Sequence, residues 1–238
     1  HAAGASGLAP LRLSRLLLTH LHSDHTAGLP DLALTPWTLG RTEPLSVYGP
    51  PGTRHMAAHV QAAWEEDVRE RLEGDEPAVN TGWRLDAIEV ESGFSLAEDG
   101  ATVEAFEVRH GGMDALGWRV SGEGGTVVIS GDTAPFPGME EAYEGADILV
   151  HEAYSEAGLS RRGADWRHYH AGAHMSARQL GAVVDKVRPG LLVLSHVLAH
   201  GAPEQTVLDE VRRGGWEGPT VLGRDLEVFG VPPGNPIV

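Results

Sequence analysis

The sequence predicts an α/β chain, and three observations support this fold class. Apolar stretches of strand length recur along the chain, segments of helical character alternate with them, and no linker-like tract or internal repeat interrupts the alternation. We therefore predict a single domain over residues 1–238. The expected helices span residues 54–72, 174–187 and 203–213.

The expected strands are shorter and more numerous than the helices. They span residues 13–18, 46–48, 85–90, 101–108, 116–121 with 126–130 as a hairpin, 146–150 and 191–195. Residues 29–45 contain Pro30, Pro36 and Pro44, so we expect a loop without long regular elements there, suited to substrate contacts. Thr53 is expected to cap the helix that follows it.

Composition restricts the class of protein. With 238 residues, 41% of them hydrophobic, the chain can bury one large core, and no apolar run approaches the roughly 18 to 20 residues that span a bilayer. The first ten residues lack a signal-peptide pattern, so a cytoplasmic location is expected. Cysteine is absent, so any metal must be held by histidine and carboxylates. The net charge of -16, without a local basic patch, argues against nucleic acid as a partner.

A dense cluster of potential metal ligands follows the first apolar stretch. His20 and His22 are two residues apart in an extended segment, so their imidazoles share one side and can reach a single cation. Asp24 and His25 follow directly and can turn toward a second cation. A single histidine here would be a surface residue more often than a ligand, but four potential ligands in six residues favour a metal site.

Three later strands also end in potential ligands. Residues 101–108 are followed by His110, residues 126–130 by Asp132, and residues 191–195 by His196. Each residue alone has an ordinary structural interpretation, since Gly-Asp is common turn chemistry. Their recurrence at strand ends favours a shared site, because strand ends at a sheet edge are where sites are usually built.

The spacing of His20, His22, Asp24 and His25 resembles the HxHxDH signature of the metallo-β-lactamase-fold hydrolases. The resemblance implies a metallo-β-lactamase-like αββα sandwich, and the strands that precede this motif in the family are expected to be missing from the given sequence. It also implies two Zn²⁺, although Mn²⁺ or Fe²⁺ would satisfy the same ligands. The implied ligands of the first metal are His20, His22 and His110; those of the second are Asp24, His25 and His196, with Asp132 bridging both.

The resemblance also implies the catalytic groups. Two metals would lower the pKa of a shared water to about 7 and hold hydroxide ready for attack, with Asp24 orienting or deprotonating it. His174 is expected near a helix N-terminus, where the local field disfavours its protonated form. Glu152 would restore that form and make His174 a proton donor to the leaving oxygen.

The segment His151-Glu152-Ala153 with a later His174 resembles the branch that contains tRNA 3′-processing endonucleases and arylsulfatase-like and phosphodiesterase-like enzymes. The main expectation is a binuclear zinc hydrolase of a small-molecule phosphodiester or sulfate ester. Three features favour it: the acidic charge, the lack of a long basic arm, and Met175-Ser176 where the tRNA enzymes read Ser-Thr. The alternative is a ribonuclease Z-like tRNA 3′-processing endonuclease, and a third is a catalytically silent metal-binding interaction protein.

Several aromatic and histidine residues keep open roles. A pocket for an apolar leaving group would draw on Trp37, Trp118, Phe136, Trp166 and Tyr169, although core or surface packing is the more common use of each. The histidines without an assigned role are His151, His168, His170 and His200, while His55 and His59 are expected on a solvated helix face. The proline-rich tail, residues 231–236, is expected to pack loosely or against a partner subunit, as in a homodimer.

Overall fold

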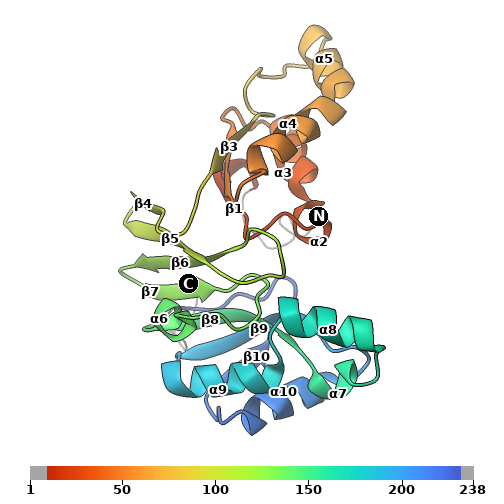
Figure 1. Ribbon diagram of the computed structural model, residues 1–238. Helices are drawn as coiled ribbons and strands as arrows, with labels where there is room; N and C mark the ends of the chain where they lie inside the picture. Colours follow the sequence, from red (N-terminus) through yellow and green to blue (C-terminus); the bar gives the residue numbers. More distant parts are fainter. Residues whose placement is uncertain (1–9, 232–238) are drawn as a thin grey trace. The chain divides into compact units, whose positions relative to one another are not determined.

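The computed structural model describes residues 10–231 (Figure 1). Within that range the chain forms two compact units, one that ends at Glu91 and one that begins at Ser92. Both combine helices with a β-sheet, which confirms the α/β class, while the single domain over residues 1–238 stays a prediction. Residues 232–236 of the proline-rich tail lie outside the described residues. None of the helices between residues 10 and 231 is both long and apolar enough to cross a membrane.

The N-terminal unit contains a parallel three-stranded sheet in the order β1-β2-β3. Its elements are η1 (Pro10–Arg12), β1 (Arg15–Leu17), α2 (Ser23–Thr26), α3 (Leu29–Thr38), β2 (Leu45–Gly49), α4 (Thr53–Ala63), α5 (Glu65–Glu73) and β3 (Leu85–Glu89). Leu16 pairs with Val47, which pairs with Ala87, so apolar residues lie in register across the sheet. Helices α3 and α4 add Leu29, Ala33 and Ala57 to the same buried cluster.

Helix α3 contradicts the predicted loop at residues 29–45. Pro30 lies in the first turn of α3, where its missing N–H costs nothing. Pro36 lies inside the helix and cannot donate to the carbonyl of Leu32. The buried Arg41 guanidinium donates to that carbonyl at 3.0 Å and to the carbonyl of Ala33 at 2.7 Å. A side chain that follows the helix therefore satisfies the acceptor that the proline leaves, which the proline pattern alone did not indicate.

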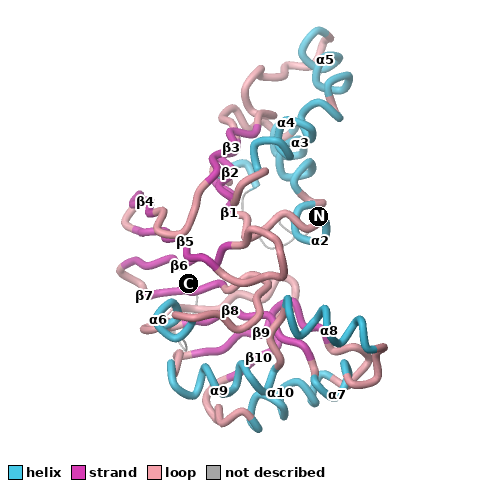
Figure 2. Tube along the Cα trace, in the orientation of Figure 1, coloured by secondary structure: helices cyan, strands magenta, loops and turns pink. Residues whose placement is uncertain are grey.

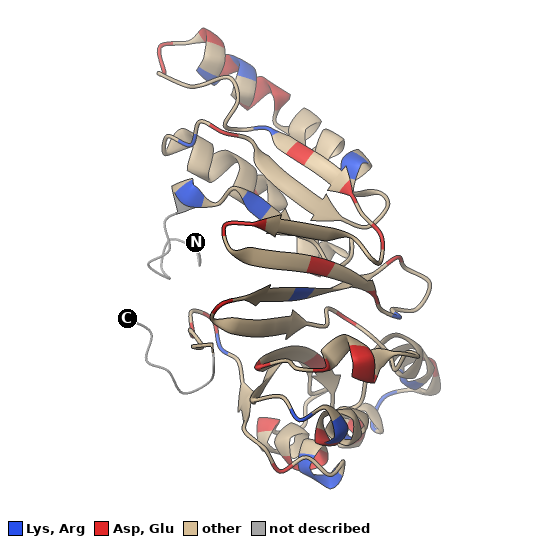
Figure 3. Ribbon diagram, turned by 90° about the vertical axis from the view of Figure 1, so that its left-hand side faces the viewer, with Lys and Arg blue, Asp and Glu red and all other residues tan. Residues whose placement is uncertain are grey.

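The predicted helix over residues 54–72 is divided into α4 and α5. Trp64 separates them with φ -111° and ψ 18°, outside the helical range. Thr53 is the first helical residue and not the cap, and its hydroxyl donates to the carbonyl of Pro50. Figure 3 shows both acidic and basic positions along α5. Arg71 bonds to Asp67 and Glu76. This pairing is typical of a solvated helix face.

The C-terminal unit contains a seven-stranded sheet in the order β10-β9-β8-β7-β6-β5-β4. Its strands are β4 (Ser95–Glu98), β5 (Ala101–Glu107), β6 (Leu116–Gly122), β7 (Gly125–Ile129), β8 (Ile148–Tyr154), β9 (Leu191–Leu198) and β10 (Thr220–Leu222). Pairing is antiparallel from β4 to β7 and parallel from β7 to β10. The strands β5, β7, β8 and β9 therefore run in the same direction, and their carboxyl ends lie at the same edge of the sheet.

Helices cover this sheet and form its core. They are α6 (Met139–Tyr143), α7 (Glu156–Leu159), α8 (Ala164–Ala173), α9 (Ala177–Val187) and α10 (Glu204–Arg213), of which α9 and α10 lie against the strands in Figure 2. Leu180 and Val184 from α9 and Val207 and Val211 from α10 join the buried cluster that includes Leu192 of β9. Burial of these side chains fixes both helices to the parallel part of the sheet.

The helix predicted to begin at residue 174 begins at Ala177. Ser176 caps it, because the Ser176 hydroxyl accepts from the backbone N–H of Gln179 and the Gln179 side chain accepts from the N–H of Ser176. This capping box was readable in the sequence Ser-Ala-Arg-Gln. His174 is extended, with φ -134° and ψ 170°, and lies between α8 and α9. The predicted helix-terminus field therefore does not act on it as an N-terminal residue of α9.

Candidate metal centre

The first set of predicted ligands lies in the N-terminal unit, just after β1. His20 is fully buried, and its Nε2 lies 3.1 Å from Nδ1 of His22. The ring of His25 lies 4.1 Å from the ring of His20, centroid to centroid. Nε2 of His25 lies 3.6 Å from Oδ2 of Asp24, which belongs with His25 to the one-turn helix α2. The structure therefore brings these four residues together within their own unit.

The second set lies at the carboxyl edge of the seven-stranded sheet. Asp132 follows β7 and is only 3% exposed. Its Oδ2 lies 4.0 Å from Nε2 of His110, which follows β5, and its Oδ1 lies 3.4 Å from Nδ1 of His196 in β9. Because β5, β7 and β9 share one direction, their ends deliver these three side chains to one place. The strand-end pattern in the sequence predicted this grouping.

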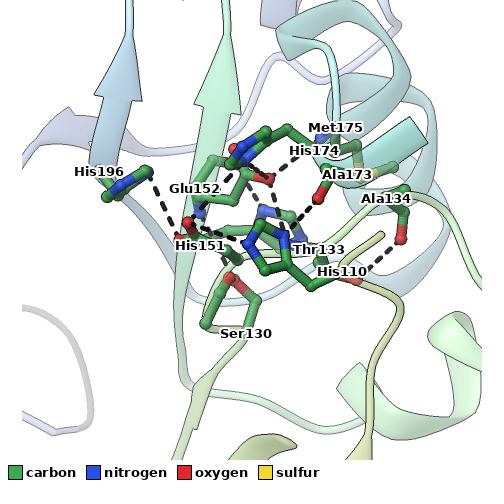
Figure 4. Close-up of polar contacts among 12 residues, drawn as sticks. His110, Ser130, Thr133, Ala134, His151, Glu152, Ala173, His174, Met175 and His196 are labelled. Atoms are coloured by element: carbon green, nitrogen blue, oxygen red, sulfur yellow. Dashed lines mark hydrogen bonds and ion pairs between the residues drawn. The ribbon is translucent and has the colours of Figure 1, made fainter. Parts of the chain in front are cut away.

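His110 is held in a defined orientation. Its Nδ1 donates to the carbonyl of Ala173 at 2.7 Å, at the end of α8 (Figure 4). This bond leaves Nε2 as the nitrogen that faces Asp132. A backbone acceptor on the second nitrogen is the usual way in which a protein fixes the tautomer of a metal-binding histidine.

His196 is presented by an irregularity in β9. His151 pairs with Leu194 and Ala153 with Val197, so β9 holds one extra residue over this span. His196 itself has φ 50°, in the left-handed region that side chains other than glycine rarely adopt. Bulges and strained residues are often found beside sites, where they direct a side chain out of the regular pleat. Here the bulge places the His196 imidazole beside Asp132.

Glu152 and His174 form a buried pair next to Asp132. Oε1 of Glu152 lies 3.1 Å from Nδ1 of His174 and also accepts from the backbone N–H groups of Thr133 and Met175 (Figure 4). Nδ1 of His174 lies 3.9 Å from Oδ2 of Asp132. Burial raises the pKa of the Glu152 carboxyl well above its usual value, and the Asp132 carboxylate raises it further. Two backbone hydrogen bonds thus hold Oε1 of Glu152 in place, and the bond to Nδ1 orients His174.

The donor atoms in the C-terminal unit fit a divalent cation. His110, Asp132 and His174 each offer one ligand atom within 4.8 Å of the others, and so do Glu152, His174 and His196. Asp132 and Glu152 are 3% and 2% exposed, and two neighbouring buried carboxylates favour positive charge between them. Imidazole nitrogens with carboxylate oxygens are a set that Zn²⁺, Mn²⁺ or Fe²⁺ accepts. Metal ligation by the seven predicted residues stays a prediction.

The aromatic residues considered for a pocket differ in burial and in the element that holds them. Trp37 and Trp118 are core residues of different units. Phe136 is half-buried and lines a cavity of about 450 Å³ that also borders His110. Trp166 and Tyr169 are exposed on α8. The core packing of Trp37 and Trp118 agrees with the more common use expected of each.

The remaining histidines have distinct surroundings. His151 is buried, with Nε2 3.1 Å from the Tyr143 hydroxyl and Nδ1 donating to the carbonyl of Glu152. Both ring nitrogens thus have partners, as in a histidine that stabilises the fold. His55 and His59 lie on the exposed face of α4, as expected, with their tilted rings 4.2 Å apart, centroid to centroid. His170 is buried, with its ring 4.5 Å from that of His200. His168 is exposed, and both His168 and His170 lie in α8, which spans Ala164–Ala173.

Two residues of the site have no sequence signal of their own. Thr133 donates its backbone N–H to Glu152 and accepts at its hydroxyl from the N–H of Arg109. Ala173 acts only through its carbonyl, on His110. Backbone groups can come from any residue type, so only the fold identifies them.

Comparison with known proteins gives matches over most of the chain. Residues 6–197 match the family model described as Beta-lactamase superfamily domain. The chain is 34% identical over 208 residues to Ribonuclease Z from Mycobacterium sp. (strain KMS), and the match covers 84% of this chain and 71% of that protein.

Solved structures give the same fold. Human tRNase Z, short form, matches with a TM-score of 0.67 at 20% identity, covering 97% of this chain and 83% of that one. The metallo-beta-lactamase fold protein YhfI from Bacillus subtilis matches with a TM-score of 0.64 at 19% identity, covering 91% and 76%. Likeness at these identities concerns the fold alone, and it confirms the metallo-β-lactamase-like fold predicted from the sequence.

One expectation about partners is wrong. The net charge of -16 argued against nucleic acid, yet the similar proteins above carry the names ribonuclease Z and tRNase Z. Net charge describes the average field of a molecule, whereas phosphate contacts depend on a local surface. The average was therefore the wrong quantity on which to exclude nucleic acid.

Proposed function

The chain belongs to the beta-lactamase superfamily, and from that membership we propose that it is a metal-dependent endonuclease of the ribonuclease Z kind, which hydrolyses a phosphodiester bond near the 3′ end of a tRNA precursor. The observation that carries the substrate class is the 34% identity to a ribonuclease Z over 84% of this chain. The same observation favours the tRNA alternative over the small-molecule ester that was the main expectation.

The residues of each unit support a metal-dependent reaction. His20, His22, Asp24 and His25 would hold cations from the N-terminal unit, and His110, Asp132 and His196 from the C-terminal unit. When bound, a pair of divalent cations supplies a water nucleophile at neutral pH and neutralises charge on the phosphate. Asp132 would contribute to holding the cations beside both histidines, because one of its oxygens faces His110 and the other faces His196. Asp24 would orient or deprotonate the attacking water.

His174 would protonate the leaving oxygen. Glu152 accepts at His174 Nδ1, so Nε2 is the nitrogen through which His174 exchanges a proton with substrate. Glu152 is hydrogen-bonded to Nδ1 of His174, and in its ionised form it would favour the protonated imidazolium, which is the form that can donate. Hydrogen bonds from Thr133 and Met175 keep the Glu152 carboxyl in place while the proton moves.

A substrate panel tests this function. The chain, loaded with Zn²⁺ or Mn²⁺, is incubated with a precursor tRNA that carries a 3′ trailer, with bis-p-nitrophenyl phosphate and with p-nitrophenyl sulfate. We expect cleavage of the precursor to a product of mature length, and loss of that cleavage in His174→Ala. His59→Ala, an exposed histidine on α4, is the matched control and should cleave normally.

Other outcomes of the panel have defined meanings. Turnover of the small esters without precursor cleavage would show that the tRNA proposal is wrong. Bound metal without turnover of any of the three substrates would favour the catalytically silent alternative. Precursor cleavage that His174→Ala leaves intact would remove His174 from its assigned role.

A further inference from the structure

We propose that helix α8 and the loop before it form a binding surface for single-stranded RNA beside the catalytic residues. The surface, which we call the α8 face, consists of Arg161, Arg162, Trp166, Arg167 and Tyr169. All five residues are exposed. This inference rests on the proposed function and adds to it the place where the unpaired 3′ segment of the substrate binds. Figure 1 shows α8 apart from the core helices α9 and α10.

The aromatic rings of the α8 face lead toward the catalytic histidine. Trp166 is 59% exposed and Tyr169 is 46% exposed, although α8 has a sheet and other helices in its own unit on which to bury them. The two rings lie edge to face with centroids 6.1 Å apart, and the Tyr169 ring lies 6.1 Å from the ring of His174. Exposed aromatic rings in a row offer stacking faces to unpaired bases.

The arginines of the α8 face have no acidic partner. Among residues 10–231, Arg161, Arg162 and Arg167 form no ion pair with a carboxylate. Arg161 donates to the carbonyl of His200, and Arg167 to the carbonyls of Ser160 and Arg162. Some other exposed arginines of this chain do have such a partner, for example Arg178 with Glu156 at 3.0 Å and Arg224 with Glu204. The guanidinium groups of the α8 face are therefore available to an external anion.

The local charge of the segment opposes the charge of the whole chain. Residues 160–170 contain three arginines and one acidic residue, Asp165, in a chain of net charge -16. The sequence-based expectation of no basic patch therefore missed this segment. His170 and His200 add little positive charge at neutral pH, because burial lowers the pKa of both imidazoles. The positive charge of the α8 face comes from its arginines.

Arginine next to exposed aromatic rings is the chemistry of a single-stranded nucleic-acid surface. Guanidinium groups contact phosphates, and rings stack on bases that are not held in a duplex. A duplex offers its phosphates but not its base faces. The combination therefore favours an unpaired strand over a duplex, and its position beside His174 suits the strand that continues past the scissile phosphate.

Binding of labelled RNA to the metal-loaded chain tests the aromatic part. The probes are a fluorescein-labelled single-stranded 12-mer and a 12-base-pair duplex, and the readout is the anisotropy-derived Kd. In Trp166→Ala/Tyr169→Ala we expect Kd for the single strand to rise about tenfold, about 1.4 kcal/mol, with less than a twofold change for the duplex. Trp166→Phe/Tyr169→Phe keeps the rings and should retain binding. Trp64→Ala, which removes a 39% exposed tryptophan elsewhere, is the control and should bind as wild type.

The salt dependence of the same Kd tests the arginines. In Arg161→Gln/Arg162→Gln/Arg167→Gln, the slope of log K against log salt should fall by about 0.7 for each lost phosphate contact. Arg212→Gln/Arg213→Gln removes two arginines from α10 and should leave the slope unchanged. Equal slopes in the triple variant and wild type would overturn the assignment of these arginines.

The outcomes separate this inference from the proposed function. If RNA binding depends on the α8 face but precursor tRNA is not cleaved, the proposed function is wrong and the inference about the α8 face is supported. The wild type could cleave the precursor while no α8-face variant with a wild-type melting temperature changes the Kd for RNA. That result would overturn the inference about the α8 face and leave the proposed function in place. If Trp166→Ala/Tyr169→Ala turns a dimer into a monomer at unchanged RNA affinity, the face joins two copies and the inference is wrong.

Discussion

His174 depends on one carboxylate for its orientation. Glu152 Oε1 lies 3.1 Å from its Nδ1, and the Glu152 side chain is itself fixed by two backbone N–H groups. A positioned proton donor typically contributes 10² to 10⁴ in rate. We therefore expect His174→Ala to lower kcat on precursor tRNA by roughly 10²- to 10⁴-fold with little change in KM.

Glu152→Gln separates positioning from charge at the same site. Glutamine keeps an oxygen for His174 and for the two N–H groups but removes the negative charge that favours the imidazolium. The expected loss in kcat is smaller than in His174→Ala. Activity should also begin to fall at a lower pH as the pH rises, because His174 loses its proton more easily without the negative charge. Single-turnover rates from pH 5 to 9 measure this, and equal losses in both variants at all pH values would contradict it.

His151 makes stability depend on pH. Burial lowers the pKa of His151 to about 4, whereas an unfolded histidine titrates near 6.5. The unfolded chain therefore binds the proton more readily between these values, so the stabilising contribution is complete above pH 6.5 and is lost as the pH falls toward 4. On the order of 3 kcal/mol is lost over this window.

Urea unfolding at pH 7.0 and pH 4.5 measures that loss. In His151→Gln the difference in unfolding free energy between the two pH values should shrink by about 2 to 3 kcal/mol relative to wild type. His59→Gln, at an exposed position on α4, should keep the wild-type difference. If the free energy of unfolding of His151→Gln depends on pH as in the wild type, other groups cause the dependence.

The site residues differ in how much of them the sequence indicated. His110 and Asp132 follow β5 and β7, His196 lies near the end of β9, and the shared direction of these strands explains why the three residues meet. The role of Ala173 is a carbonyl bond to His110, and the direction of His196 comes from a bulge that depends on pairing with β8. Neither feature leaves a residue pattern, because both arise from contacts between distant backbone segments.

Helices α9 and α10 approach each other closely at a glycine. A methyl group at Gly181 of α9 would overlap the carbonyl oxygen of Val211 in α10. Backbone cannot move aside as a flexible side chain does, so Gly181→Ala would separate the two helices that cover β8 and β9. We expect a loss of about 1 to 3 kcal/mol in the free energy of unfolding, measured by urea denaturation.

Gly172 provides the matched substitution. It lies in α8, and a methyl group there would meet nothing within 4 Å. Alanine is favoured over glycine in a helix, so Gly172→Ala should stabilise the chain by about 0.5 to 1 kcal/mol. Similar losses in Gly181→Ala and Gly172→Ala would contradict the close helix approach.

Elements with a clear periodic pattern were predictable, and those set by tertiary contacts were not. The strands at residues 101–108 and 191–195 and the helix at 203–213 correspond to β5, β9 and α10. Helix α3 was missed, since Arg41 satisfies a carbonyl that Pro36 cannot. The short edge strands β4 and β10 were also missed, because three or four residues carry too little pattern to separate a strand from a loop.

At the scale of the whole molecule, the net charge and the local charge of the α8 face favour different substrates. The net charge of -16 suggested a small anionic ester, yet the α8 face holds three arginines without acidic partners among the described residues. Acidic residues in α5 are partly paired with arginine, as Arg69 and Arg71 show. The average charge therefore reflects the solvated faces more than the surface beside the catalytic residues.

The sequence predicts that seven side chains between residues 20 and 196 serve one paired-cation centre. His20 and its neighbours belong to one unit, and Asp132 and its neighbours to the other. If one pair of cations draws ligands from both, a substitution in either unit must lower metal content. We expect two metal ions per chain by elemental analysis, and about one or fewer in His20→Ala and in His196→Ala.

Melting temperatures give a second readout of the same centre. A ligand at 100 times its Kd stabilises the folded state by about 2.7 kcal/mol, so Zn²⁺ should raise the melting temperature of the chelator-treated wild type. Both single variants should lose most of that rise, because removing a ligand from a shared site weakens the remaining ligands together. The exposed pair in His55→Ala/His59→Ala should keep both the rise and the metal content. A full rise and two bound ions in His196→Ala would mean that the N-terminal unit binds metal without it, and the shared centre would then be wrong.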